Sequence, residues 1–209
     1  SIYYHNSYWK LAADEALLLA SAESRLHQML ACGTTSVEIK TGYGLDLATE
    51  LKMLRVIDQL AQTLPLTIIP TFLGAHTLPP EFKEKPDAYV ALVVDEMLPA
   101  VANWYAQSSF ANRQIPLFCD VFCEDHAFDV AQSRRILLAA KQHGLLPKIH
   151  VDQFNALGGV EMAIGLGAIS ADHLDVTDVA HINLLAQSNT VCVLLPAVNL
   201  NLGMADFAN

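Results

Sequence analysis

Two histidines stand at the ends of neighbouring apolar segments and carry groups that can bind a metal. His150 lies in the segment 148–151, and His173 follows the segment 168–171. Neutral imidazoles on adjacent strand ends can hold a divalent metal together with its water, whose pKa the metal lowers. A lone histidine at such a place is more often a hydrogen-bonded structural residue, so the prediction of a metal-dependent hydrolytic site depends on the pair.

Three other places could add side chains to the same site. His76 follows the apolar segment 66–72, and Tyr43 lies between two glycines that allow a tight turn and expose its ring. Both also suit simpler roles, a histidine that caps a turn and an aromatic ring that packs on the rim. Glu124 and His126 follow the segment 116–122, and we interpret them as part of a solvated loop. We interpret the remaining histidines as surface or hydrogen-bonded core residues, namely His5, His27, His143 and His181.

The elements that must position these side chains alternate along the chain. Helical patterns are expected at 11–31, 47–62, 87–105, 130–143, 158–166 and 177–187, the last with Thr177 as its N-cap. Short apolar strands are expected at 34–39, 66–72, 116–122, 148–151, 168–171 and 190–195. This α/β pattern fits an open doubly wound sheet or most of a (β/α)8 TIM barrel of the metal-dependent hydrolase type.

The barrel is the favoured alternative of the two. The only glycine-rich turn after a strand, Gly42-Tyr43-Gly44, lacks the third glycine of a dinucleotide-binding loop. About six βα units are present, and the chain starts without Met. We therefore expect residues 1–209 to be a single partial barrel domain from which the first and last barrel strands are absent.

Composition excludes several other classes of function. The net charge is −10, and 53% of the residues are hydrophobic while 16% are charged, which does not favour binding to nucleic acid or to an anionic membrane. No CxxC pair occurs among the four cysteines, and we interpret Cys119 and Cys123 as buried small hydrophobic residues. A cytoplasmic protein is expected.

Five segments resemble the imidazolonepropionase family of the amidohydrolase superfamily, in the same order as in that family. The resemblance runs from about Leu26 to Pro196 and is carried by Val37–Leu45, Thr71–His76, Asp120–Glu124, Lys148–Gln153 and Ser170–Leu174. It implies hydrolysis of the cyclic amide of 4-imidazolone-5-propanoate to N-formimidoyl-L-glutamate in histidine degradation, by a metal-activated water. The two histidine strands alone mark only the wider superfamily.

The resemblance also implies roles for individual residues. His150 would bind one Zn²⁺ or Fe³⁺ ion, and His173 would orient or deprotonate the attacking water. Tyr43 and His76 would hold the substrate, and Gln153 would contact its ring. Some family members carry Glu at the position of Gln153, and an amide cannot serve as a base. A homodimer is a further expectation from the family.

This sequence departs from the family pattern in its metal ligands. No HxH pair occurs, and the expected terminal metal-binding Asp is absent. The family has a substrate-binding arginine near the position of residues 1–10, but no arginine precedes Arg25 in this sequence, and Lys10 is the candidate replacement. Two alternatives therefore stay open, namely another cyclic amidohydrolase or deaminase of the superfamily and a catalytically inert barrel fragment.

Overall fold

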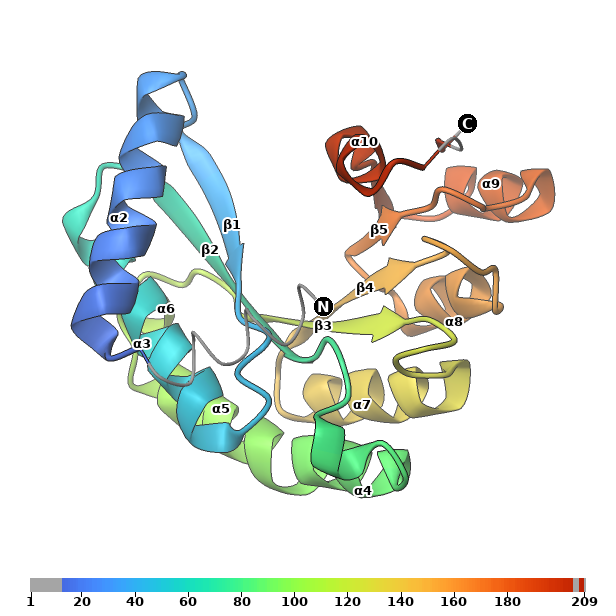
Figure 1. The fold of residues 1–209 in the computed structure, drawn as a ribbon, viewed down its shortest axis with the longest axis horizontal. Helices are drawn as coiled ribbons and strands as arrows, with labels where there is room; N and C mark the ends of the chain where they lie inside the picture. Colours follow the sequence, from blue (N-terminus) through green and yellow to red (C-terminus); the bar gives the residue numbers. More distant parts are fainter. Residues whose placement is uncertain (1–12, 205–206, 209) are drawn as a thin grey trace.

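The computed structural model describes residues 13–204 and 207–208, in which a curled sheet is covered by helices on its convex face (Figure 1). His5 and Lys10 lie outside the described residues. The strands are β1 (Ser36–Lys40), β2 (Thr67–Ala75), β3 (Phe118–Cys123), β4 (Leu146–Val151), β5 (Ser170–His173) and β6 (Val191–Val193). The α-helices are α2 (Glu15–Ala31), α3 (Leu47–Thr63), α4 (Pro86–Leu92), α5 (Leu98–Ala106), α6 (Ser109–Asn112), α7 (Val130–Gln142), α8 (Gly159–Leu166), α9 (Val179–Ala186) and α10 (Pro196–Leu202), and η1 (Pro80–Phe82) and η2 (Val93–Met97) are a 3₁₀-helix and a π-helix.

The order of the strands decides between the two predicted architectures. Every strand pairs in parallel with the next one along the chain, so the spatial order is β1-β2-β3-β4-β5-β6. A doubly wound sheet would reverse its order at a switch point, whereas sequential order is that of a barrel. The six strands form a curled half-barrel, so all strand ends that precede a helix lie along one edge (Figure 1).

The hydrophobic core lies between the convex face of the sheet and the helices. Alternate side chains of β3 show the division, because Cys119, Val121 and Cys123 are fully buried in this core while Asp120 faces the concave side. The prediction that Cys119 and Cys123 are buried is therefore confirmed. Leu54, Tyr89 and Ile136 are also fully buried and come from three different helices.

Aspartates begin four of the helices. Asp14, Asp46, Asp129 and Asp178 each accept a hydrogen bond from a backbone N–H in the first turn, which typically contributes about 1 kcal/mol per helix. The prediction that Thr177 caps the last of these helices was wrong. Its hydroxyl donates instead to Oδ2 of Asp152 at 2.9 Å, and the N-cap is the next residue, Asp178.

The helix predicted at 87–105 is interrupted. It divides into α4, a π-helical turn at η2, and α5, because Pro99 has no N–H to continue the α-helical ladder. At the junction the N–H of Leu98 bonds to the carbonyl of Val93, five residues back. The sequence analysis also did not predict α6 and α10.

None of the described helices combines the length and the hydropathy that a membrane-spanning helix requires.

Candidate active site

Four aromatic side chains predicted to belong to the site form a continuous row. The ring centroids of Tyr43 and His76 are 4.4 Å apart, those of His76 and His150 are 6.0 Å apart, and those of His150 and His173 are 5.3 Å apart. They come from the carboxyl ends of β1, β2, β4 and β5. Gln153 follows the end of β4 by two residues and is 7% exposed. In barrels this edge carries the catalytic groups.

The loops of this edge adopt conformations that most residues avoid. Six described residues other than glycine have positive φ, and five of them end or follow β1, β4 or β5, namely Tyr43, Leu45, Asp152, His173 and Leu174. Such conformations cost free energy and persist where the surrounding structure enforces them, often at functional sites. Gly42 has a φ of 104°, and an added Cβ would lie 3.4 Å from Nδ1 of His76. The glycine therefore lets the Tyr43 loop approach His76.

The position of His76 is set by the end of β2. The register between β2 and β3 shifts between Phe72 and Ala75, which bends the strand just before the histidine. The hydroxyl of Tyr89, a fully buried residue of α4, donates to the carbonyl of Gly74 at 2.8 Å. A helix on the convex face thus fixes the strand end from which His76 extends.

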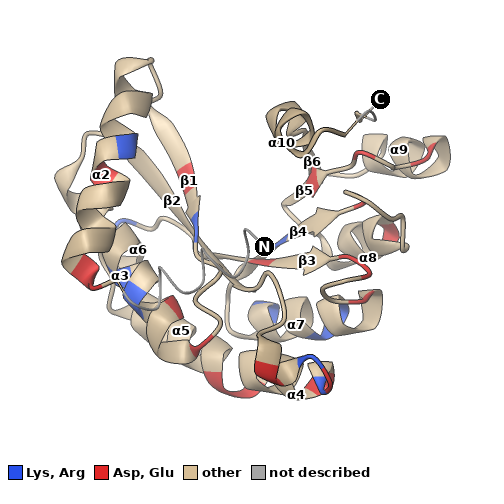
Figure 2. Ribbon diagram, viewed as in Figure 1, with Lys and Arg blue, Asp and Glu red and all other residues tan. Residues whose placement is uncertain are grey.

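A charged cluster fills the concave face next to the row of rings. Nζ of Lys40 lies 2.6 Å from Oδ2 of Asp120 and 2.7 Å from Oδ2 of Asp172. Glu38 joins the cluster through Lys40 at 3.6 Å and through Lys148 at 2.8 Å. Figure 2 shows these charges on the inner strands as well as those on the outer helices. Lys40, Asp120 and Asp172 come from alternate strands, as the layers inside a barrel do.

The lysine and the aspartates of this cluster shift each other's pKa toward the charged forms. Burial by itself disfavours the Lys40 ammonium, but the charges of Asp120 and Asp172 raise the pKa of Lys40 well above its usual range. Burial likewise opposes ionisation of Asp120, yet His150 and Lys40 hold the pKa of that carboxyl well below its usual range. Both groups are therefore charged at neutral pH.

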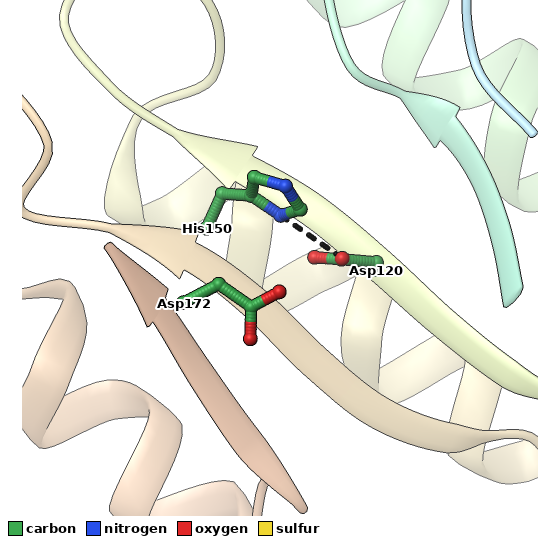
Figure 3. Close-up of side chains that lie close together, drawn as sticks. All are labelled: Asp120, His150 and Asp172. Carbon is green, nitrogen blue, oxygen red and sulfur yellow. Dashed lines mark ion pairs between the residues drawn. The ribbon is translucent and has the colours of Figure 1, made fainter. Parts of the chain in front are cut away.

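His150 is oriented by Asp120. Nδ1 of the imidazole lies 2.9 Å from Oδ2 of Asp120, and the two side chains point toward each other from β4 and β3 (Figure 3). The contact is a close electrostatic one, because no aligned hydrogen bond joins Nδ1 to the carboxylate in the described structure. The second ring nitrogen points away from Asp120 (Figure 3). This is the arrangement in which a carboxylate supports a metal-binding histidine.

Asp120, His150 and Asp172 can be tested as a metal-binding group. One potential ligand atom from each lies within 4.8 Å of the others, and imidazole nitrogen and carboxylate oxygen are ligands that zinc accepts. Oδ1 of Asp120 is also buried with no hydrogen-bond partner among the described residues. Lys40, however, already forms an ion pair with each carboxylate. An ion held by all three residues would have to displace this ammonium, so only His150 fits a ligand role without rearrangement.

His173 is buried and electrically neutral at physiological pH. Burial and the neighbouring His150 lower the pKa of His173 to about 4. Its Nδ1 lies 3.6 Å from Oδ2 of Asp175, and Asn199 of α10 donates to the other oxygen of Asp175 at 2.7 Å. A neutral imidazole can accept a proton or a hydrogen bond, which is the chemistry that a water-orienting residue needs.

The interpretation of Glu124 as part of a solvated loop was wrong. Glu124 is fully buried, and its carboxylate accepts hydrogen bonds from the backbone of Asp125, Phe154 and Asn155. His126 is exposed, as expected for a loop. The sequence analysis also missed Lys40, Asp120 and Asp172 as a cluster. The available signal was that β1, β3 and β5 each carry charged residues, although parallel strands covered by helices are usually apolar.

The other described histidines are not part of the row of rings. His27 and His143 are exposed, and His181 contacts Asp178 and Glu161. Within the described residues, the site histidines are therefore His76, His150 and His173.

Comparison with known proteins finds relatives that share the sequence of nearly the whole chain. No protein-family model matches the chain. Imidazolonepropionases of Herpetosiphon aurantiacus and Chloroflexus aggregans are each 56% identical over 94% of this chain and 46% of their own length. The imidazolonepropionase of Alkaliphilus metalliredigens is 47% identical over 91% of this chain and 43% of its own length.

Solved structures agree on the fold. An amidohydrolase from an environmental sample of the Sargasso Sea has a TM-score of 0.62 at 17% identity, over 91% of this chain and 46% of its own. An adenine deaminase from Arthrobacter aurescens has a TM-score of 0.56 at 13% identity, over 86% of this chain and 52% of its own. Over almost its whole length, this chain is thus similar to a part of imidazolonepropionases, and it spans about half the length of the curated relatives it matches.

Proposed function

We propose that the full-length protein hydrolyses 4-imidazolone-5-propanoate to N-formimidoyl-L-glutamate by a metal-activated water. The observation that carries the proposal is the row formed by Tyr43, His76, His150 and His173 along one edge of the half-barrel. The relatives that share up to 56% of the sequence are named imidazolonepropionase, which supports this substrate. The product follows from opening of the cyclic amide by water.

The fold that would support this activity is a complete (β/α)8 barrel. Six of its strands are present in sequential order, and two further βα units would close the sheet. In this proposal residues 1–209 form part of a single barrel domain. The remaining metal ligands would come from the parts of the barrel that this chain does not include.

His150 is the residue of this chain that would hold a Zn²⁺ or Fe³⁺ ion. When bound, the ion would polarise the carbonyl of the substrate and lower the pKa of a water molecule. Asp120 holds the His150 ring in a fixed orientation through its contact with Nδ1. A preoriented imidazole loses less rotational freedom on binding a cation, so this pair favours metal affinity.

His173 would act on the attacking water. Its ring lies beside that of His150, and at neutral pH it is uncharged, so it can orient the water and accept its proton. Gln153 would contact the imidazolone ring as a hydrogen-bonding group only, because an amide does not accept a proton at neutral pH. Proton transfer in this chain is therefore assigned to His173.

Tyr43 and His76 would bind the substrate at the other end of the row. Their rings are in edge contact, and the tyrosine stands on a loop that approaches the histidine through Gly42. A phenol and an imidazole offer donors for the carbonyl and carboxylate oxygens of a small anionic substrate. The row thus extends from a substrate-binding end at Tyr43 to a water-activating end at His173.

The proposal is tested with the full-length gene product and 4-imidazolone-5-propanoate, whose ring absorbance is followed over time. Wild-type protein should open the ring, and His150→Ala should remove nearly all activity. His27→Ala is the matched control, since that histidine is exposed on α2. Full activity of His150→Ala, or an inactive wild-type protein loaded with Zn²⁺ or Fe³⁺, would contradict the proposal.

A further inference from the structure

A buried glutamate lies beneath the loop that carries Tyr43. Glu50, in the first turn of α3, is fully buried. Its Oε1 accepts hydrogen bonds from the N–H groups of Gly44 at 2.9 Å and Leu45 at 3.2 Å, and its Oε2 accepts from Gly42 at 3.3 Å. The donors all belong to the segment between β1 and α3. The carboxylate therefore binds the backbone on both sides of Tyr43.

The shape of the Tyr43 loop matches this carboxylate closely. A Cβ at position 44 would lie 2.6 Å from Oε1 of Glu50, so only glycine allows the backbone to come this near. Tyr43 and Leu45, on either side, have φ values of 63° and 62°. Tyr43 lies between two of the N–H donors and Leu45 is itself a donor, which indicates that Glu50 holds the loop in this conformation.

A second buried glutamate has the same relation to the loop that carries Gln153. Oε2 of Glu124, just after β3, accepts from the N–H groups of Phe154 at 2.9 Å and Asn155 at 3.2 Å. Oε1 accepts from Nδ2 of Asn155 at 2.8 Å and from the N–H of Asp125 at 2.9 Å. Glu124 is fully buried, like Glu50. Three of its four donors directly follow Gln153 in the chain.

Neither Glu50 nor Glu124 forms an ion pair with a lysine or arginine among the described residues. A buried carboxylate is costly unless hydrogen bonds compensate it, and here the donors are loop N–H groups together with the side chains of Thr41 and Asn155. At Glu50 the burial still raises the pKa of the carboxyl. An apolar side chain would fill either position at lower cost but could not hold a loop. The burial thus indicates a role in loop conformation.

We propose that Glu50 and Glu124 are positioning residues that hold the Tyr43 and Gln153 loops in their substrate-binding conformations. This inference rests on the proposed function, because Tyr43 and Gln153 are substrate-binding residues only within it. The two glutamates contact neither His150 nor His173 in the described structure. Their loss should therefore weaken substrate binding more than the chemical step.

The test uses the full-length protein with Glu50→Gln and Glu124→Gln. Glutamine keeps the shape of the glutamate side chain but replaces one accepting oxygen by an NH₂ group. This group cannot accept from the backbone N–H that it faces, so that hydrogen bond is lost. Each variant should raise KM about tenfold, the effect of losing roughly one net hydrogen bond, while kcat changes less than about threefold. Glu96→Gln, an exposed glutamate of η2, is the matched control and should leave both constants unchanged.

A milder variant avoids changing a buried side chain. Asn155 is exposed, and Asn155→Asp would put a carboxylate 2.8 Å from that of Glu124. The repulsion should raise KM as Glu124→Gln does, whereas Asn103→Asp, on the outer helix α5, should not. If KM stays at the wild-type value in all three loop variants of an active enzyme, the inference is wrong, whatever happens to the melting temperature.

Amide hydrogen exchange separates this inference from the proposed function. Glu50→Gln should speed exchange at Gly44 and Leu45 by about tenfold or more and leave Phe154 and Asn155 unchanged, and Glu124→Gln should do the reverse. This pattern needs no substrate. If the wild-type protein is inactive but the two variants show these exchange differences, the proposed function is contradicted and the positioning role is supported. Unchanged exchange in both loops would overturn the inference.

Discussion

Nδ1 of His150 lies 2.9 Å from Oδ2 of Asp120, whose same oxygen lies 2.6 Å from Nζ of Lys40. One buried carboxylate oxygen thus joins the proposed metal-binding histidine to the charged cluster inside the half-barrel. The cluster therefore does more than fill the concave face, because a change at Asp120 acts on the ring of His150 directly and a change at Lys40 acts on it through Asp120.

Replacement of Asp120 should weaken metal binding. In Asp120→Asn the ring of His150 loses its charged partner, and metal affinity of the full-length protein should fall about 10–100-fold. Metal content after dialysis against a graded chelator series measures this change. Asp172→Asn is the matched control, because Asp172 shares Lys40 but forms no ion pair with His150 in the described structure. Equal losses in both variants would show that the effect comes from the cluster in general.

Loss of the Tyr43 hydroxyl should act on substrate binding. Tyr43→Phe should raise KM for 4-imidazolone-5-propanoate about tenfold, the effect of one lost hydrogen bond, with little change in kcat. Steady-state kinetics give both constants. Tyr105→Phe, which removes a hydroxyl bonded to the carbonyl of Ile115, should affect stability only. An unchanged KM in Tyr43→Phe would favour a related amidohydrolase or deaminase substrate over the named one.

Removal of the Lys40 ammonium should strongly destabilise the fold. Lys40→Met leaves the carboxylates of Asp120 and Asp172 buried without their shared cation, a change that typically costs about 3–5 kcal/mol. Urea unfolding of the full-length protein measures the loss. Adding Asp172→Asn should recover part of it, and the exposed Lys85→Met should cost little. A stability unchanged by Lys40→Met would mean that water replaces the ammonium.

Glu124 should make stability depend on pH in the acid range. Burial opposes its ionisation, but hydrogen bonds from Asn155, Asp125 and Phe154 lower the pKa of Glu124 below its ordinary value. The unfolded chain therefore binds the proton more tightly than the folded one, so this stabilisation is present above about pH 4.5 and is lost as the pH falls below it. The difference in unfolding free energy between wild type and Glu124→Gln should shrink from pH 6 to pH 3.5. A constant difference would contradict the assignment.

Much of the fold could be predicted because it depends on local pattern. All six strands and their helices follow from short apolar runs that alternate with helical spacing, and the boundaries differ mostly by one or two residues. The π-helical turn before Pro99 was missed, although proline cannot continue an α-helix. Thr177 was taken as a cap because the sequence does not show that Asp152, far away in the chain, receives its hydroxyl.

The site was predictable only in part for a similar reason. Tyr43, His76, His150 and His173 stand at strand ends, and strand order alone brings them to one edge. Lys40 meets Asp120 and Asp172 across sequence separations of 80 and 132 residues, which no local pattern specifies. Glu50 and Glu124 accept hydrogen bonds from backbone N–H groups. Every residue except proline has such a group, so the sequence does not indicate which of them a glutamate binds. These contacts require coordinates.

The sequential order of the strands has a consequence for how the protein is made. Each strand pairs with the strand before it in the chain, so the sheet can assemble from its amino-terminal strand during translation. Lys40 is present from the first strand, but Asp172 emerges only with the fifth. Until then the nascent half-barrel carries an ammonium ion with an incomplete set of partners. The arrival of β5 is thus the step of synthesis at which Lys40 gains its second aspartate partner.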